Sequence, residues 1–158
     1  MSGTRPSEAD FPAVGRRVAI VAARYNDAIV SALLQGAIDT WRQHGGEERD
    51  LFVARVPGAF ELPVVARRLI ASGRYEAIVA LGCVIRGDTP HFEYVAGECA
   101  RGLQQASCDT GVPVAFGVLT LDNIEQARAR AGADSGNKGA EAMASALEMA
   151  HLMARLPR

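Results

Sequence analysis

The feature that most constrains this chain is an apolar run, residues 77–85, that ends in a short polar turn. The run is rich in β-branched residues and interrupted only by Gly82, which is typical of a strand that a parallel sheet buries on both faces. After the turn, Thr89 is suited to cap a helix and Pro90 to occupy its first position. We therefore expect His91 in the first turn of that helix.

This turn would lie where parallel sheets bind ligands, beyond the carboxyl end of a strand. Free N–H groups at the start of a helix attract anions. The residues that would present them are Gly87, Asp88 and Thr89. The stretch therefore predicts an anion site beside the titratable side chain of His91.

The same order of strand, turn and helix recurs along the chain. Apolar runs predict three further strands, at residues 17–23, 51–56 and 113–119. Apolar periodicity predicts helices between them that end near Gly45, Gly73 and Gly111, then a short helix after Asn123 and a last one after the segment 132–139. Parallel strands joined by helical crossovers form a sheet with helices on both faces. The predicted class is α/β, a three-layer α/β/α sandwich with a central four-stranded parallel sheet of the flavodoxin-like type.

Length and composition limit the kind of protein this can be. The 158 residues fit one domain, 1–158, in which 1–12 reads as a flexible tail. No apolar run approaches the ~20 residues that span a bilayer, and the polar start lacks a signal peptide's apolar core, so we expect a cytoplasmic protein. A net charge of −1 without a basic run argues against nucleic acid as a partner. The three cysteines lack C-x-x-C spacing, and no metal or dinucleotide motif occurs, so no cofactor is expected.

Polar and aromatic residues gather in the turns that follow the strands. A parallel sheet brings such turns to one rim, here residues 24–27, 57–61, 86–91 and the segment after Phe116. Tyr25 and Phe60 would supply flat apolar surfaces there, and Asn26 and Glu61 would supply hydrogen bonds. This combination suits a planar heterocycle.

Each of these residues also has an ordinary structural explanation. Tyr25 and Phe60 could simply pack, Glu61 could complement a helix dipole, and His91 could be a helix-end histidine bonded to the backbone. Lys138 is the only lysine among 17 basic residues, either because an ammonium is required there or by chance.

The last helix carries two apolar stripes. One holds Ala140, Met143, Ala144, Leu147 and Ala150, and the other holds Ala142, Ala146, Met149, Met153 and Leu156. A helix on the outside of a monomer needs one such stripe. The second stripe predicts contact with another subunit.

Four blocks of sequence resemble one enzyme family, and the resemblance as a whole covers nearly all of residues 17–156. The blocks are VPGAFELP (56–63), GCVIRGDTPHFEYV (82–95), FGVLTLDNIEQA (116–127) and AGADSGNKG (131–139). They resemble the 6,7-dimethyl-8-ribityllumazine synthases of riboflavin biosynthesis. The resemblance implies condensation of 5-amino-6-(D-ribitylamino)uracil with 3,4-dihydroxy-2-butanone 4-phosphate, with release of phosphate and water and without a cofactor.

The resemblance also implies a role for each residue of the expected site. Tyr25 would stack on the pyrimidine, where the family more often has Phe or Trp, and His91 would transfer protons. The pyrimidine and its ribityl chain would also meet Asn26, Ala59, Phe60, Glu61, Val84 and Ile85, together with Phe116 and Lys138 of a neighbouring subunit. The phosphate would be held by Gly87, Asp88, Thr89 and the neighbour's Arg130.

The family forms pentamers, and many members assemble twelve pentamers into a sixty-subunit shell. The resemblance therefore implies a homo-oligomer with active sites at subunit interfaces, in which the N-terminal segment is a candidate fifth strand on a neighbour's sheet. Riboflavin synthase is an implied partner. The alternative from another class is a non-catalytic shell that stores flavin or lumazine. The joint presence of His91, Arg130 and Lys138 favours the enzyme.

Overall fold

Four parallel strands form the centre of the structure. The computed structural model describes residues 11–132 and 136–158. In it, β1 (Val18–Ala23), β2 (Leu51–Val56), β3 (Ala77–Ile85) and β4 (Val114–Leu121) pair in the order β2-β1-β3-β4, always in parallel. This is the doubly wound order of flavodoxin-like folds, so the predicted fold class is confirmed.

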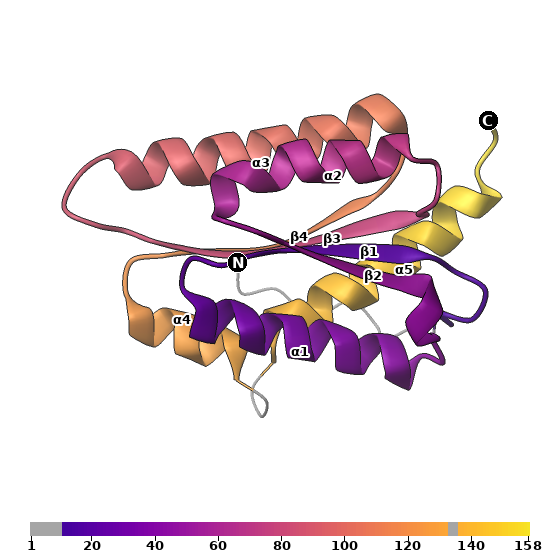
Figure 1. The fold of residues 1–158 in the computed structure, drawn as a ribbon, viewed down its shortest axis with the longest axis horizontal. Coiled ribbons are helices and arrows are strands. Elements are labelled where there is room, and N and C mark those ends of the chain that lie inside the picture. The colour runs from indigo at the N-terminus through magenta and orange to yellow at the C-terminus, as the bar shows by residue number, and fades with distance from the viewer. Residues whose placement is uncertain (1–10, 133–135) are drawn as a thin grey trace.

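Five helices cover the two faces of the sheet and make the three layers visible in Figure 1. One face is covered by α2 (Leu62–Ala71) and α3 (His91–Thr110), and the other by α1 (Asp27–Gln43), α4 (Ile124–Ala131) and α5 (Lys138–Arg155). Two short 3₁₀ turns, η1 (Glu48–Asp50) and η2 (Ala59–Glu61), flank β2. None of the helices in the described ranges combines the length and the apolar character needed to cross a membrane.

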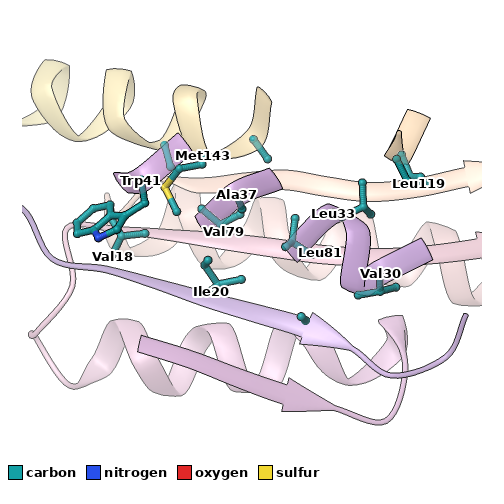
Figure 2. Packing of buried hydrophobic residues seen from close by; sticks show 14 of the residues in the cluster. Val18, Ile20, Val30, Leu33, Ala37, Trp41, Val79, Leu81, Leu119 and Met143 are labelled. Atoms are coloured by element: carbon teal, nitrogen blue, oxygen red, sulfur yellow. The ribbon is translucent and has the colours of Figure 1, made fainter. Parts of the chain in front are cut away.

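The central strands β1 and β3 are buried on both faces. On the α1 and α5 side, Figure 2 shows strand residues packed with helix residues, among them Val18, Ile20, Val79, Leu81, Leu33, Trp41 and Met143. On the opposite side, strand residues including Val21 and Ile78 pack with Leu62, Ala66 and Leu103. Burying a large apolar side chain stabilises a fold by roughly 1.5–3 kcal/mol. The carboxyl ends of β1 and β3 are thereby held in fixed positions relative to each other.

The start of α3 differs from the prediction by one residue. Thr89 was expected to cap the helix, with Pro90 as its first residue, but Pro90 takes the cap position and His91 begins the helix. The Pro90 carbonyl accepts from the backbone N–H of Glu93 at 2.9 Å, whereas the Thr89 hydroxyl accepts a longer bond, 3.4 Å, from the His91 N–H. The placement of His91 in the first turn is confirmed.

Two further boundaries differ from those expected. The fourth strand runs past residue 119, because its pairing with β3 continues to Ile85 and Leu121. The last helix begins at Lys138 rather than after Gly139, because the Asn137 side chain caps it by accepting from the Ala140 N–H at 3.0 Å. Lys138 therefore stands on a helix and not in a loop.

The two stripes predicted for α5 are not separate faces. Its buried face combines members of both, namely Ala142, Met143, Ala146, Leu147 and Ala150. The large apolar residues left exposed are Met149, Leu152 and Leu156, spaced at helical intervals towards the C-terminal end, and Ala144 of the first stripe is exposed as well. The apolar surface that α5 leaves exposed is therefore narrower than a complete second stripe.

Candidate active site

A cavity of about 570 Å³ opens at the carboxyl ends of β1, β2 and β3. It is lined by Tyr25, Asn26, Gly58, Ala59, Phe60, Glu61, Cys83, Val84, Ile85, His91, Tyr94 and Val95. The expected convergence of the turns after the first three strands is confirmed. The cavity is of the size that small planar ligands occupy.

The turn after β1 is held in an unusual backbone conformation. Asn26 has φ 59° and ψ 49°, and among the described residues it is the only non-glycine with positive φ. Its side-chain amide donates to the carbonyl of Cys83 at 2.8 Å, which ties this turn to β3. The backbone N–H of Tyr25 donates to Pro57 at 3.0 Å, which ties it to the turn after β2.

Tyr25 presents its ring to the cavity and is 73% exposed. A Cβ added at Gly58 would lie 3.0 Å from the ring atom Cδ2, tighter than ordinary contact. Glycine at position 58 therefore lets the aromatic ring lie close to the backbone of the second turn. The ring leaves most of one surface free for a ligand.

The second turn contributes an aromatic ring and a carboxylate. Phe60 is 59% exposed, whereas Ala59 beside it is buried. Glu61 lies at the end of η2, where its N–H donates to Gly58 at 3.2 Å. Within the described residues no hydrogen bond or ion pair engages the Glu61 carboxylate. It is available to accept hydrogen bonds from a ligand.

The turn after β3 presents unused hydrogen-bond donors. Gly87, Asp88 and Thr89 are exposed beside the cavity, and no described hydrogen bond uses their backbone N–H groups. A Cβ at Gly87 would meet nothing within 4 Å, so space remains above the turn. Three free N–H groups at the approach to a helix can bind an anion.

Arg86 braces this turn, and sequence reasoning assigned it nothing. Its Nε donates to Asp122 at 3.0 Å, its guanidinium lies 4.5 Å from the centre of the Phe92 ring, and it also reaches Glu93 at 3.5 Å. The hydrogen bond with Asp122 raises the pKa of Arg86, with Glu93 contributing in the same direction. The Arg86 guanidinium is therefore held by residues of its own chain.

Two lining residues, Tyr94 and Cys83, were also not assigned. Tyr94 follows His91 by three positions, so the helical repeat alone could have placed it on the same face. Burial raises the pKa of the Cys83 thiol to about 11, which keeps it protonated and non-nucleophilic at neutral pH. Cys83 contributes through its backbone carbonyl.

Phe116, Arg130 and Lys138 lie apart from this cavity. They line a second one, of about 350 Å³, between β4, α4 and α5, and the two cavities share no residue. Phe116 pairs with Ala80 in the body of the sheet and is 50% exposed, so it lies away from the rim. The turn that follows its strand does reach the rim, where Asp122 accepts a hydrogen bond from Arg86. The Arg130 guanidinium donates to the Gln126 carbonyl at 3.0 Å, and Lys138 pairs with Glu141 at 2.8 Å.

The charges are divided between the two cavities. Among the residues that the structure describes, no lysine or arginine lines the first cavity, whereas Arg130 and Lys138 line the second. Among the described residues, no group of three potential ligand side chains could hold a metal ion. One chain therefore offers an aromatic and hydrogen-bonding half-site with a histidine, and elsewhere a cationic half-site with an aromatic ring.

The chain was compared with known protein families and curated proteins. Residues 15–154 match the family model described as 6,7-dimethyl-8-ribityllumazine synthase. The chain is 54% identical over 149 residues to the 6,7-dimethyl-8-ribityllumazine synthase of Nitratidesulfovibrio vulgaris (strain DSM 19637 / Miyazaki F), an alignment that covers 94% of this chain and 96% of the relative.

Proposed function

Because this chain belongs to the 6,7-dimethyl-8-ribityllumazine synthase family, we propose that its two half-sites, brought together from two copies, form the active site. The protein catalyses the condensation of 5-amino-6-(D-ribitylamino)uracil with 3,4-dihydroxy-2-butanone 4-phosphate to the lumazine, with release of phosphate and water. The observation that supports this division most strongly is that, of the described residues, neither a lysine nor an arginine lines the first cavity.

The first cavity binds the pyrimidine. Tyr25 stacks on the heterocycle, as its free ring surface allows, and Phe60 covers it from the second turn. Asn26 and Glu61 form hydrogen bonds with the ribityl hydroxyls and the ring edge, and Ala59 contacts the ribityl chain. Val84 and Ile85 meet the ring through their backbone groups at the end of β3.

The phosphate lies on the turn after β3. The free N–H groups of Gly87, Asp88 and Thr89 donate to its oxygens, while the Asp88 carboxylate turns away. A phosphate dianion also needs cations, and the planar fork of Arg130 from a neighbouring subunit is suited to it. Phe116 and Lys138 of the same neighbour close the site. The second copy thereby supplies the charge that the first cavity lacks.

His91 transfers protons. Formation of the imine between the pyrimidine amine and the ketone, elimination of phosphate and ring closure each move a proton, and imidazole can accept and donate one near neutral pH. Orientation of two bound reactants can contribute roughly 7–11 kcal/mol, so one proton carrier among many binding groups is sufficient.

A divided site requires a homo-oligomer. The contact is heterologous, so it must close into a ring or continue as a filament. We propose a ring of five, alone or assembled further into a sixty-subunit shell. β2 is an edge strand with Phe52 and Val53 exposed, which supports the N-terminal segment of a neighbour as a fifth strand.

The whole chain acts as one domain of the synthase, and riboflavin synthase, which uses the product, is a candidate partner. The cysteines Cys83, Cys99 and Cys108 are all free, which supports a reducing compartment such as the cytoplasm.

Incubating the purified protein with both substrates tests the function directly. We expect fluorescent lumazine to appear with one orthophosphate released for each molecule formed. The variant Arg130→Ala should raise the KM for the butanone phosphate and weaken inhibition by inorganic phosphate, since a charge-assisted contact of ~1.5–3 kcal/mol is lost. If no product forms while riboflavin is bound tightly, the storage alternative replaces the enzyme. If the KM rises only for the pyrimidine, Arg130 is misassigned.

A further inference from the structure

Arg55 stands at a sheet position where neighbouring residues are apolar. It is the next-to-last residue of β2 and pairs with Ala22 of β1, which puts it on the face of the sheet covered by α1. Leu51 and Val53, on the same face of the strand, lie against helix α1 and its surroundings. Arg55 therefore places a positive charge between the sheet and the first residue of α1.

The guanidinium of Arg55 makes three hydrogen bonds around one turn. Its Nε donates to the carbonyl of Ala22 at 3.3 Å, and one terminal nitrogen donates both to the carbonyl of Ala23 at 3.2 Å and to the carboxylate of Asp27 at 2.8 Å. The side chain is 31% exposed. It therefore bonds to the last residues of β1 and to the first residue of α1.

Between these anchors lie Arg24, Tyr25 and Asn26. Asn26 adopts the left-handed conformation, which costs free energy and persists only where the surroundings enforce it. The Asn26 amide bond to Cys83 fixes one side of the turn, and Arg55 fixes both of its ends on the other side. Arg55 also belongs to the strand that leads directly into the turn carrying Phe60 and Glu61.

We propose that Arg55 is a positioning residue for the pyrimidine half of the active site. The partners of its hydrogen bonds, Ala22, Ala23 and Asp27, are not among the residues that line the cavity. Arg55 acts by holding Tyr25 and Asn26 in register with Phe60 and Glu61. Lysine could not replace it, because a single ammonium cannot span two carbonyls and a carboxylate as the planar fork does. The inference rests on the proposed function for its kinetic consequence alone.

The anion turn after β3 and the cationic half-site on α4 and α5 make none of these contacts. The effect of losing Arg55 should therefore be selective for one substrate. We expect Arg55→Met to raise the KM for the pyrimidine about 10-fold while the KM for the butanone phosphate changes less than about 2-fold. Arg55→Lys should fall between this variant and the wild type.

Amide hydrogen exchange gives a second measurement that does not depend on turnover. The N–H groups of Ile29 and Val30 donate to the Asn26 carbonyl, and that of Tyr25 donates to Pro57. In Arg55→Met these amides should exchange about 10-fold faster, with unchanged exchange in α3. Arg49→Met is the matched control, because Arg49 is also exposed and its ion-pair partners within the described residues are Glu47 and Asp50, outside the turn.

The outcomes separate the possibilities. Equal rises in both KM values, or exchange at residues 25–30 no faster than in Arg49→Met, would overturn the positioning role. A double-mutant cycle with Asp27→Asn should be non-additive if the two side chains act together. If the wild type makes no lumazine, the proposed function fails, while the exchange experiment still decides whether Arg55 fixes the turn.

Discussion

His91 begins α3 and lines the first cavity, and the proposed mechanism gives it the proton transfers. We expect His91→Ala to lower kcat by roughly 10–10³-fold with little change in either KM, because proton transfer rather than affinity is removed. Steady-state lumazine fluorescence measures this. His44→Ala, which alters a histidine bonded to Thr40 away from the cavity, should keep its kcat. An unchanged kcat in His91→Ala would assign the imidazole to packing.

We expect the buried thiols of Cys83 and Cys99 to make the free energy of unfolding depend on pH in the alkaline range. Burial raises the pKa of the Cys83 thiol from 9.0 to about 11 and that of Cys99 from 9.0 to about 12. In the unfolded chain both thiols ionise near pH 9, so above that pH the unfolded state loses protons that the folded state keeps. The free energy of unfolding should therefore fall as the pH rises from about 9 through the folded pKa values, by on the order of 1 kcal/mol per pH unit for each thiol.

Urea unfolding at about pH 8 and about pH 10.5 checks the coupling. The wild type should lose more stability between the two conditions than Cys99→Ala, which retains one buried thiol. The substitution also leaves a cavity, but its cost is the same at both pH values, so it cancels when the loss of stability between them is compared for the two proteins. Equal losses in the two proteins would contradict the coupling.

The sequence predicted the site residues that lie in the turns, but not the residues whose long side chains bond to other elements. Tyr25, Phe60 and His91 were found because short turns after parallel strands must meet at one rim. Arg55 and Arg86 were not, because a long arginine side chain bonds across elements and its partners leave no local signal. The role expected for Phe116 came from the family resemblance alone, because this residue lies in the body of an edge strand and the sequence of one chain does not show what covers that strand.

At the scale of elements, Gly139 sets how closely α5 crosses α1. A Cβ at this position would overlap the carbonyl oxygen of Leu33, on the backbone of α1. We expect Gly139→Ala to force the helices apart and to destabilise the fold by at least about 1–3 kcal/mol. Glu148→Ala, on the exposed face of α5, should change the free energy of unfolding by less than about 0.5 kcal/mol. Equal denaturation midpoints for the two variants would refute the close crossing.

The elements were predicted best where the apolar pattern had sharp ends. The bounds of β2 and β3 match the sequence-based ranges, because polar turns flank both runs. The end of β4 was missed because exposed Thr120 interrupts its apolar run although the backbone pairing continues. The start of α5 was missed because Asn137, its cap, stands in a glycine-rich segment that reads as a loop; residues 133–135 of that segment lie outside the described residues.

At the scale of the whole molecule, the divided site predicts a defined particle. A ring of five would have a mass near five times that of the 16.7 kDa chain, and a complete shell would be twelve times larger. Light scattering over a range of concentrations distinguishes these sizes. We expect the pentamer as the smallest particle, because an open assembly of fewer chains leaves at least one first cavity without a neighbour's cation. A monomer that turns over both substrates would refute the shared site.

Mixing two defective variants tests the sharing itself. His91→Ala damages the first half-site and leaves Arg130 intact, whereas Arg130→Ala damages the second and leaves His91 intact. When both chains assemble in one particle, some interfaces combine the intact half of each, so activity should exceed the mean of the separate variants.

With random mixing in equal amounts, about one interface in four has both halves intact, since each half is intact in half of the chains. Co-expression followed by assays below the KM for the butanone phosphate gives the recovered fraction. A double variant carrying both substitutions in one chain, co-expressed with wild type, is the control: it also leaves about one site in four intact, so the two preparations should reach similar rates. Recovery no greater than the mean of the single variants would place His91 and Arg130 of the same chain in one site, which would require the two cavities of this structure to merge within a subunit.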